Sequence, residues 1–208
     1  MAIILINGLV SFKGFNDTVF FDRFKFSIKA IKAGQKERMC TSGFLHADIS
    51  HLLFNMLTLY FFSEIVIGWF GSIKFLGIYF ISLIAGSLLA FVFHRNEPYY
   101  TATGASGAVT GILYSAILLQ PAMRLGIMFI PIPLPAYVLG IGYLLYAIYG
   151  IKSRQGNIGH TSHFGGAVGG YLTTLILMPS LLVTDTFVVL LLATPIILLL
   201  VLDKLSKL

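Results

Sequence analysis

A serine flanked by small residues is the first group in this sequence that could do covalent chemistry. Ser106 lies in the run Gly104-Ala-Ser-Gly107, at the start of a short apolar segment. A serine at a helix start has unpaired backbone N–H groups beside it, and such groups can bind the oxyanion of an acyl-transfer reaction. The same residues also suit helix packing, because Gly107 and Gly111 form a Gly-x-x-x-Gly pattern. On this motif alone, packing is the better-supported interpretation.

A histidine in a second apolar segment supplies the general base that such a serine needs. His163 is followed by Gly166, Ala167 and Gly170 at helical spacing, so the four residues share one face. A histidine within a membrane span is costly and indicates function by default. The small residues allow a close approach to the segment that carries Ser106. A Ser–His hydrogen bond of about 2.6–3.2 Å requires that approach.

A third apolar segment carries polar side chains that could stabilise negative charge. His51 and Asn55 are four residues apart, share a helix face and both carry N–H donors. Glu64 lies further along this segment, where an unpaired carboxylate is costly, and we expect it to make a structural hydrogen bond. His160 lies nearer the surface than His163 and is interpreted as a polar packing residue. No carboxylate lies in the other segments, which predicts a Ser–His dyad without a third member.

The elements that position these residues must lie in lipid. Of the 208 residues, 57% are hydrophobic and 11% are charged, and soluble domains carry about twice that charged share. The apolar residues are gathered in long runs, and a run in lipid must satisfy its own backbone as a helix. We therefore expect an all-α membrane protein with a single integral membrane domain over residues 1–208.

Seven candidate spans follow from the apolar runs. They are Met1–Phe12, Leu52–Phe70, Phe75–Phe93, Ser106–Leu119, Leu134–Tyr149, Thr161–Met178 and Phe187–Leu202. The first is short because Lys13 interrupts it. The fourth is only about 21 Å long at about 1.5 Å per residue, against a hydrocarbon core of about 30 Å. The chain before Ser106 must therefore enter the membrane as irregular backbone inside a cavity lined by protein or water.

The long stretch between the first two spans, Lys13–Ser50, mixes phenylalanines with lysines and arginines. This mixture favours a segment at the membrane interface over a disordered basic loop, which carries few aromatic residues. The net charge of +6 gathers beside the spans, where basic residues meet lipid head groups, so it does not indicate nucleic acid. The lone Cys40 excludes an intrachain disulfide. The five histidines form no recognisable ligand set, so we expect no metal and no other cofactor.

Five sequence patterns resemble those of the rhomboid family of intramembrane serine proteases, and they occur in the family's order between residues 38 and 170. They are Thr41-Ser-Gly-Phe-Leu-His46, His51-Leu-Leu-Phe-Asn-Met56, Glu64, Gly104-Ala-Ser-Gly107 and His160-x-x-His163-x-Gly-Gly166. The resemblance implies a rhomboid-like six-helix transmembrane bundle, here with a seventh, C-terminal span. It also implies a first loop half-sunk in the outer leaflet.

The resemblance assigns a role to each candidate residue. It implies Ser106 as nucleophile, His163 as base, and His51, Asn55 and the Ser106 amide as oxyanion stabilisers. The residues with expected structural roles are Arg38, Glu64, Gly104, Gly107, Gly166 and Gly170. The protein is then expected to be a serine endopeptidase whose partners are the lipid bilayer and the transmembrane proteins that it cleaves, with no nucleic acid involved. The sequence leaves the substrate and the oligomeric state open.

The sequence departs from the family pattern at three places. The usual Trp-Arg pair of the first loop reads Glu37-Arg38, so only the arginine carries over. Some members place an aromatic residue one turn after the serine, where it stacks on the histidine, and here that position is Thr110. The first span, before Lys13, is clipped.

Charge and family disagree about orientation. If the helices alternate, every lysine and arginine except Lys74 and Arg124 lies on the side of the long loop. The positive-inside rule then places the active-site side in the cytoplasm, whereas the family's orientation places it outside. We follow the family, because a structured loop carries basic residues for reasons unrelated to insertion. We expect a multi-pass protein of the plasma (inner) membrane.

Other functions are weighed against the protease. A catalytically inactive rhomboid-like binding factor would be expected to have lost Ser106 or His163. A transporter would be expected to show paired, interrupted repeats, and no internal repeat is visible. A zinc protease would carry a pattern such as His-Glu-x-x-His, which the sequence lacks. An α/β-hydrolase needs Gly-x-Ser-x-Gly after a strand, but Ala108 replaces the last glycine and no strand is expected before the serine.

Overall fold

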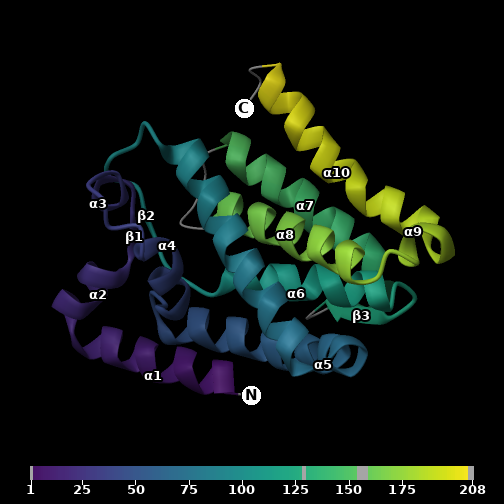
Figure 1. The fold of residues 1–208 in the computed structure, drawn as a ribbon, viewed down its shortest axis with the longest axis horizontal. Coiled ribbons are helices and arrows are strands. Elements are labelled where there is room, and N and C mark those ends of the chain that lie inside the picture. Colours follow the sequence, from purple (N-terminus) through teal and green to yellow (C-terminus); the bar gives the residue numbers. More distant parts are fainter. Residues whose placement is uncertain (1, 128–129, 154–158, 206–208) are drawn as a thin grey trace.

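The computed structural model describes residues 2–127, 130–153 and 159–205, and most of these residues are helical (Figure 1). The long helices are α1 (Ala2–Asn16), α5 (Ile49–His94), α6 (Ser106–Leu119), α7 (Ala136–Ser153), α8 (His160–Leu177) and α10 (Thr186–Lys204). The short ones are α2 (Thr18–Phe24), α3 (Ile28–Lys32), α4 (Arg38–Thr41), α9 (Leu181–Thr184) and the 3-10 helix η1 (Ser42–Phe44). Strand β1 (Phe26–Ser27) pairs antiparallel with β2 (Thr101–Ala102), and β3 (Arg124–Ile127) with β4 (Ile130–Pro135).

Helix α5 contains the second and third predicted spans. Gly71 has φ 76° and ψ 168°, a conformation that breaks the helix into two arms, residues 49–70 and 72–94. Only glycine adopts this conformation without strain. Helices α5, α7 and α10 are long and apolar enough to cross a membrane, while α1 and α6 are apolar but shorter.

The first predicted span is longer than expected. Helix α1 continues through Lys13 to Asn16, so the expectation that this lysine ends the span is wrong. The Lys13 ammonium lies 2.8 Å from the Asp17 carboxylate, and a lysine near a helix end can extend its charge away from the apolar region.

The proline-rich stretch before α7 forms a hairpin that the sequence analysis does not predict. Pro131, Pro133 and Pro135 occupy alternate positions of β4. An edge strand tolerates proline where the missing N–H would point away from its partner. Helix α7 begins directly after Pro135. A proline is tolerated at this point because no helical hydrogen bond needs its missing N–H.

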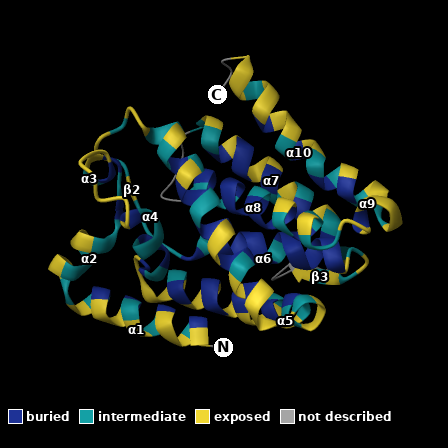
Figure 2. Cartoon of the chain, viewed as in Figure 1, coloured by how far each residue is buried: buried dark blue, intermediate teal, exposed yellow. Residues whose placement is uncertain are grey.

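Helix α6 forms the centre of the bundle (Figure 2). All of its residues except Ser106 and Leu113 are buried, and the second arm of α5 and helix α8 pack against it. In Figure 2 exposed positions lie on the outer elements of the bundle, among them α1, α5 and α10. A short helix is tolerated at this place because protein surrounds it.

The stretch between α1 and α5 is folded. The Asp17 carboxylate caps α2 by accepting the Phe20 N–H at 2.9 Å, and the Ser27 hydroxyl caps α3 in the same way. The β1–β2 pair then joins this stretch to the segment that leads to Ser106. A disordered basic loop is therefore the wrong alternative.

Candidate active site

Ser106 is the first residue of α6, and the turn before it requires glycine. Gly104 has φ 122°, and its N–H donates to the Ser42 carbonyl oxygen at 3.0 Å. A side chain at this position would be strained and would also meet the imidazole of His51. The structural role expected of Gly104 is thus to bring irregular backbone to the helix start.

His46 holds the same turn from the other side. The Ala105 N–H donates to His46 Nε2 at 3.3 Å, so the proton of the ring is on Nδ1 and is donated to Ser11 Oγ at 2.9 Å. Ser11 in turn donates to the Phe44 carbonyl oxygen at 3.0 Å. Burial, assisted by His51 nearby, lowers the pKa of His46 to about 3. The ring therefore stays neutral, as an acceptor must.

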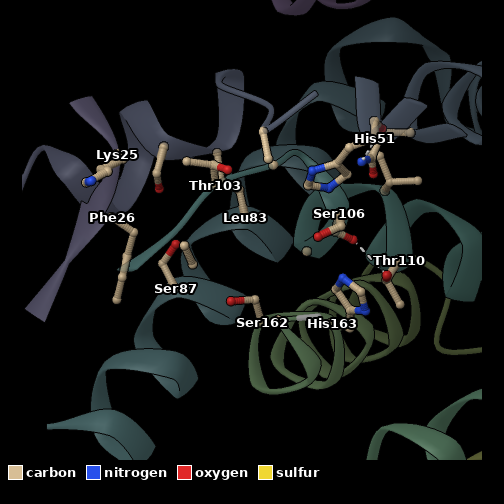
Figure 3. A pocket seen from close by; sticks show the side chains of 18 of the residues that line it. Lys25, Phe26, His51, Leu83, Ser87, Thr103, Ser106, Thr110, Ser162 and His163 are labelled. Atoms are coloured by element: carbon tan, nitrogen blue, oxygen red, sulfur yellow. Dashed lines mark hydrogen bonds between the residues drawn. The ribbon is translucent and has the colours of Figure 1, made fainter. Parts of the chain in front are cut away.

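His163 lies in the first turn of α8 and faces Ser106 across a cavity of about 1080 Å³ (Figure 3). Both side chains line this cavity. Among the described residues, no hydrogen bond joins Ser106 to His163 directly. Hydrogen bonds of this kind often tighten only when a substrate is bound. The arrangement therefore has the components of a nucleophile–base pair.

Helices α6 and α8 touch backbone to backbone. A methyl group added to Gly166 would overlap the Gly107 carbonyl, and one added to Gly170 would overlap the Gly111 carbonyl. A methyl group on Gly107 would lie 3.1 Å from the carbonyl oxygen of residue 162. The small residues are therefore used for packing, and this packing also brings the helix starts that carry Ser106 and His163 together.

His51 and Asn55 line the same cavity from the first arm of α5. A Cβ on Gly104 would lie 2.7 Å from His51 Nε2 and 3.7 Å from Ser106 Oγ, so the imidazole is beside the nucleophile. Asn55 Nδ2 donates one hydrogen to the His51 carbonyl oxygen at 3.0 Å, and its second hydrogen remains for another acceptor. Both side chains thus line the cavity that contains Ser106.

Tyr143 is a cavity residue that the sequence analysis missed. Its hydroxyl lies 2.8 Å from His163 Nδ1, and the two rings are nearly parallel, with centroids 6.0 Å apart and an interplanar angle of 19°. The aromatic neighbour that some relatives place one turn after the serine comes here from α7. Nothing in the sequence distinguishes Tyr143 from the other tyrosines of α7, so no signal identified it.

Arg38 anchors the stretch between α1 and α5 although the tryptophan of the usual pair is absent. Its guanidinium is buried and donates to the carbonyl oxygens of Asp22 and Lys25 at 2.8 and 2.9 Å. Its Nε donates to Gln35 Oε1 at 2.7 Å. Glu37 is exposed. Arg38 thus connects three parts of this stretch through three hydrogen bonds, in keeping with a structural role.

Three other expectations have different outcomes. Glu64 is an exposed residue of α5, near the break at Gly71. Within the described part of the chain its side chain makes no hydrogen bond, so the expectation of a structural hydrogen bond is wrong. His160 is buried and packs edge-on against Tyr146, in keeping with a packing residue. The expectation of no strand before Ser106 is also wrong, because β2 is there, although it has only two residues.

Comparison with known proteins gives consistent matches. The Rhomboid domain family model matches residues 33–180. The RHOMBOID-like protein 12, mitochondrial, of Arabidopsis thaliana is 30% identical over 184 residues, which cover 80% of this chain and 54% of that protein. The Rhomboid protease GluP of Bacillus subtilis (strain 168) is 36% identical over 143 residues, covering 68% of this chain and 26% of GluP. The Rhomboid protein 1, mitochondrial, of Saccharomyces cerevisiae is 31% identical over 134 residues, which cover 63% of this chain and 39% of that protein. The chain spans about half the length of these relatives or less.

Proposed function

The chain belongs to the rhomboid family and is a multi-pass integral membrane protein, and we propose that it is an intramembrane serine endopeptidase that uses Ser106 and His163. The observation that carries this proposal is the meeting of these two side chains in one cavity with His51 and Asn55. Four side chains that can form hydrogen bonds converge there from three helices.

The proposed reaction begins with proton transfer from Ser106 Oγ to His163 Nε2. The oxygen attacks the carbonyl carbon of the scissile peptide, and the carbonyl oxygen becomes an oxyanion. His163 then gives its proton to the leaving nitrogen, the C–N bond breaks, and an acyl ester remains on Ser106. A water molecule gives a proton to His163 and attacks the ester, which releases the acid and returns the proton to Ser106.

The oxyanion needs donors placed before the reaction begins. The first backbone N–H groups of α6, including that of Ser106, have no partner within the helix, and we propose that they bind the oxyanion. His51 and Asn55, whose Nδ2 has a second hydrogen to donate, line the same cavity and would add side-chain donors. Donors fixed in a cavity that excludes bulk water are worth more than the same donors in water.

The substrates we propose are transmembrane segments of other proteins with residues that weaken their helices. A scissile bond within a helix is hydrogen-bonded, so the segment must unwind locally before Ser106 can attack it. We further propose six core spans with α10 as a seventh, and a location in the plasma membrane. Two of the relatives carry "mitochondrial" in their names, so cell fractionation is the relevant test, and recovery with another membrane would contradict this location.

The test is cleavage of a panel of single-span reporter proteins in detergent and in liposomes. We expect the wild type to cleave some reporters, and Ser106→Ala and His163→Ala to cleave none while remaining folded. The exposed Ser72 provides a matched control, and Ser72→Ala should cleave at the wild-type rate. Labelling by a fluorophosphonate, which reports an activated serine without any protein substrate, should be lost in both inactive variants.

Two outcomes would contradict the proposal. If Ser106→Ala cleaves like the wild type, another group is the nucleophile. If the wild type neither cleaves any reporter nor reacts with the fluorophosphonate, the chain is an inactive rhomboid-like binding protein.

A further inference from the structure

We propose that Tyr143 and Thr110 are positioning residues that fix the tautomer of His163 through a directed chain of hydrogen bonds. This inference rests on the proposed function of Ser106 and His163. In a Ser–His–Asp triad the carboxylate holds the imidazole in the tautomer that the base requires. In the described part of the chain no carboxylate is bonded to His163, and the Tyr143 hydroxyl occupies that place.

The last acceptor, the Ser106 carbonyl oxygen, determines which group donates in each hydrogen bond of the series. The Thr110 hydroxyl lies 2.7 Å from the Ser106 carbonyl oxygen, and a carbonyl oxygen can only accept. Thr110 therefore donates its single hydrogen to Ser106. Because that hydrogen is used, Thr110 Oγ1 can only accept from its other neighbour, the Tyr143 hydroxyl at 3.4 Å.

The same counting fixes the proton of His163. The Tyr143 hydroxyl donates its single hydrogen toward Thr110, so its oxygen accepts from His163 Nδ1 at 2.8 Å. Nδ1 then carries the ring proton and Nε2 carries the lone pair. That is the tautomer in which Nε2 can take the proton of Ser106. The chain thus leads from the base to the backbone of the nucleophile itself.

The fold places Tyr143 for this contact. Gly140 lies one turn before Tyr143 on the same face of α7, and its carbonyl oxygen accepts a hydrogen bond from the buried Tyr114 hydroxyl of α6. The near-parallel Tyr143 and His163 rings also limit rotation of the imidazole. Thr110 occupies the place at which some family members carry an aromatic residue, and here Tyr143 supplies a ring to His163 from α7.

The kinetic test uses single-atom changes in the folded, full chain. Tyr143→Phe removes the hydroxyl and keeps the ring, and it should lower kcat by about 10- to 100-fold, by analogy with metal-ligating histidines that lose an orienting partner, with little change in KM. Thr110→Val should have a smaller effect, because its bond to Tyr143 is long, and Thr110→Ser should retain activity. The double variant should be little worse than Tyr143→Phe alone, because both act through one chain. Tyr149→Phe, an exposed position on the same helix, should match the wild type.

A second measurement does not depend on activity. Nitrogen-15 spectra of histidine-labelled protein, with the His163 signal assigned by difference from His163→Ala, report which ring nitrogen carries the proton. We expect protonated Nδ1 in the wild type and in Ser106→Ala, and a mixture of tautomers in Tyr143→Phe. If no variant or wild-type protein cleaves a reporter, the proposed function fails while this measurement still decides the tautomer.

The inference is overturned if His163 of the wild type is protonated on Nε2. It is also overturned if Tyr143→Phe leaves both kcat and the tautomer unchanged. If Tyr143→Phe does not fold, the comparison of Thr110→Val with Thr110→Ser decides the matter, and equal kcat values for these two variants would then overturn it.

Discussion

The α6–α8 crossing and the crossing of α7 with α6 and α10 both contain glycine, but an added methyl group would meet different atoms in each. At Gly166 it would overlap a backbone carbonyl of α6. At Gly140 it would lie 3.0 Å from the Ile117 Cδ1 atom and 3.3 Å from the Leu192 Cδ2 atom, which are the ends of flexible side chains. Backbone cannot move aside without moving the whole helix, whereas a side chain can change rotamer. The first crossing is therefore rigid and the second adaptable.

The two crossings also differ in what they position. The rigid crossing holds together the two helices that carry Ser106 and His163. The second arm of α5 packs into this crossing through Gly86. The adaptable crossing carries Tyr143, whose contact with His163 is a hydrogen bond through a long side chain. The proposed reacting groups thus lie where distances are set by backbone, and the residue that orients the base lies where small errors can be absorbed.

The largest effect is expected at Asn55, on the first arm of α5, which we propose as an oxyanion donor beside the rigid crossing. Asn55→Ala should lower kcat by about 10²–10³-fold, the scale of losing one such donor. Reporter cleavage under saturating substrate measures this change. A loss below about threefold would assign Asn55 to packing, and the His51→Ala and double variants would show whether His51 masks part of the effect.

The next effect tests the rigidity of the α6–α8 crossing. Gly166→Leu should force the two helices apart and lower kcat/KM by about 10²-fold, since a displacement of about 1 Å has this consequence. Gly170→Leu should act in the same way. Activity and the thermal midpoint should be measured together, so that loss of catalysis is separated from loss of folding.

Matched controls come from the adaptable crossing and from beyond the glycine patch. Gly140→Ala should change kcat/KM by less than about threefold, because only side-chain ends need to move, and Leu175→Ala should be similarly mild for catalysis. If Gly166→Leu stays folded and cleaves normally, the backbone contact does not position the dyad. If Gly140→Ala is as damaging as Gly166→Leu, the distinction between the crossings is wrong.

The smallest effect concerns stability and comes from His46, outside both crossings. Its folded pKa of about 3 lies below the ordinary value of 6.5. Between these values the unfolded chain binds a proton that the folded chain does not. The folded state should therefore lose stability as pH falls from about 6.5 toward 3, by up to about 1.4 kcal/mol per pH unit.

Thermal midpoints in detergent at pH 7 and pH 5 measure this dependence. His46→Gln keeps an acceptor for the Ala105 N–H but cannot titrate, so its midpoint should fall less than that of the wild type between the two values. His51 and Asp48, the groups that act on His46, are unchanged in the variant. Equal falls in both proteins would assign the pH dependence to other groups.

The sequence predicts the central helix and the reacting groups well for a physical reason. The bounds of α6 agree with the predicted span, because Gly104 marks its start and Pro121 follows its end. Ser106 is conspicuous because it lies between small residues at a helix start, and His163 because ionisable side chains in apolar runs are costly. Their convergence also follows from the sequence, since glycines at helical spacing predict which faces meet.

Other features depend on contacts that no local pattern contains. Tyr143 is one of several tyrosines on α7, and its contact with His163 exists only because α7 approaches α6 at Gly140. His46 matches a family pattern, but its partners on α1 and on the turn before Ser106 lie far from it in sequence. Lys13 shows the reverse case: a charge that suggests the end of a helix is accommodated by one ion pair.

The enclosure of α6 has a consequence for the membrane around the protein. A span that touches lipid must match the thickness of the hydrocarbon layer, or else tilt or deform the bilayer. The residues of α6 are buried except Ser106 and Leu113, which line the cavity. Helix α6 is thus free of hydrophobic mismatch, although it is about 21 Å long. The depth of the nucleophile is therefore set by neighbouring helices, and a thinner or thicker bilayer acts on the outer spans before it acts on Ser106.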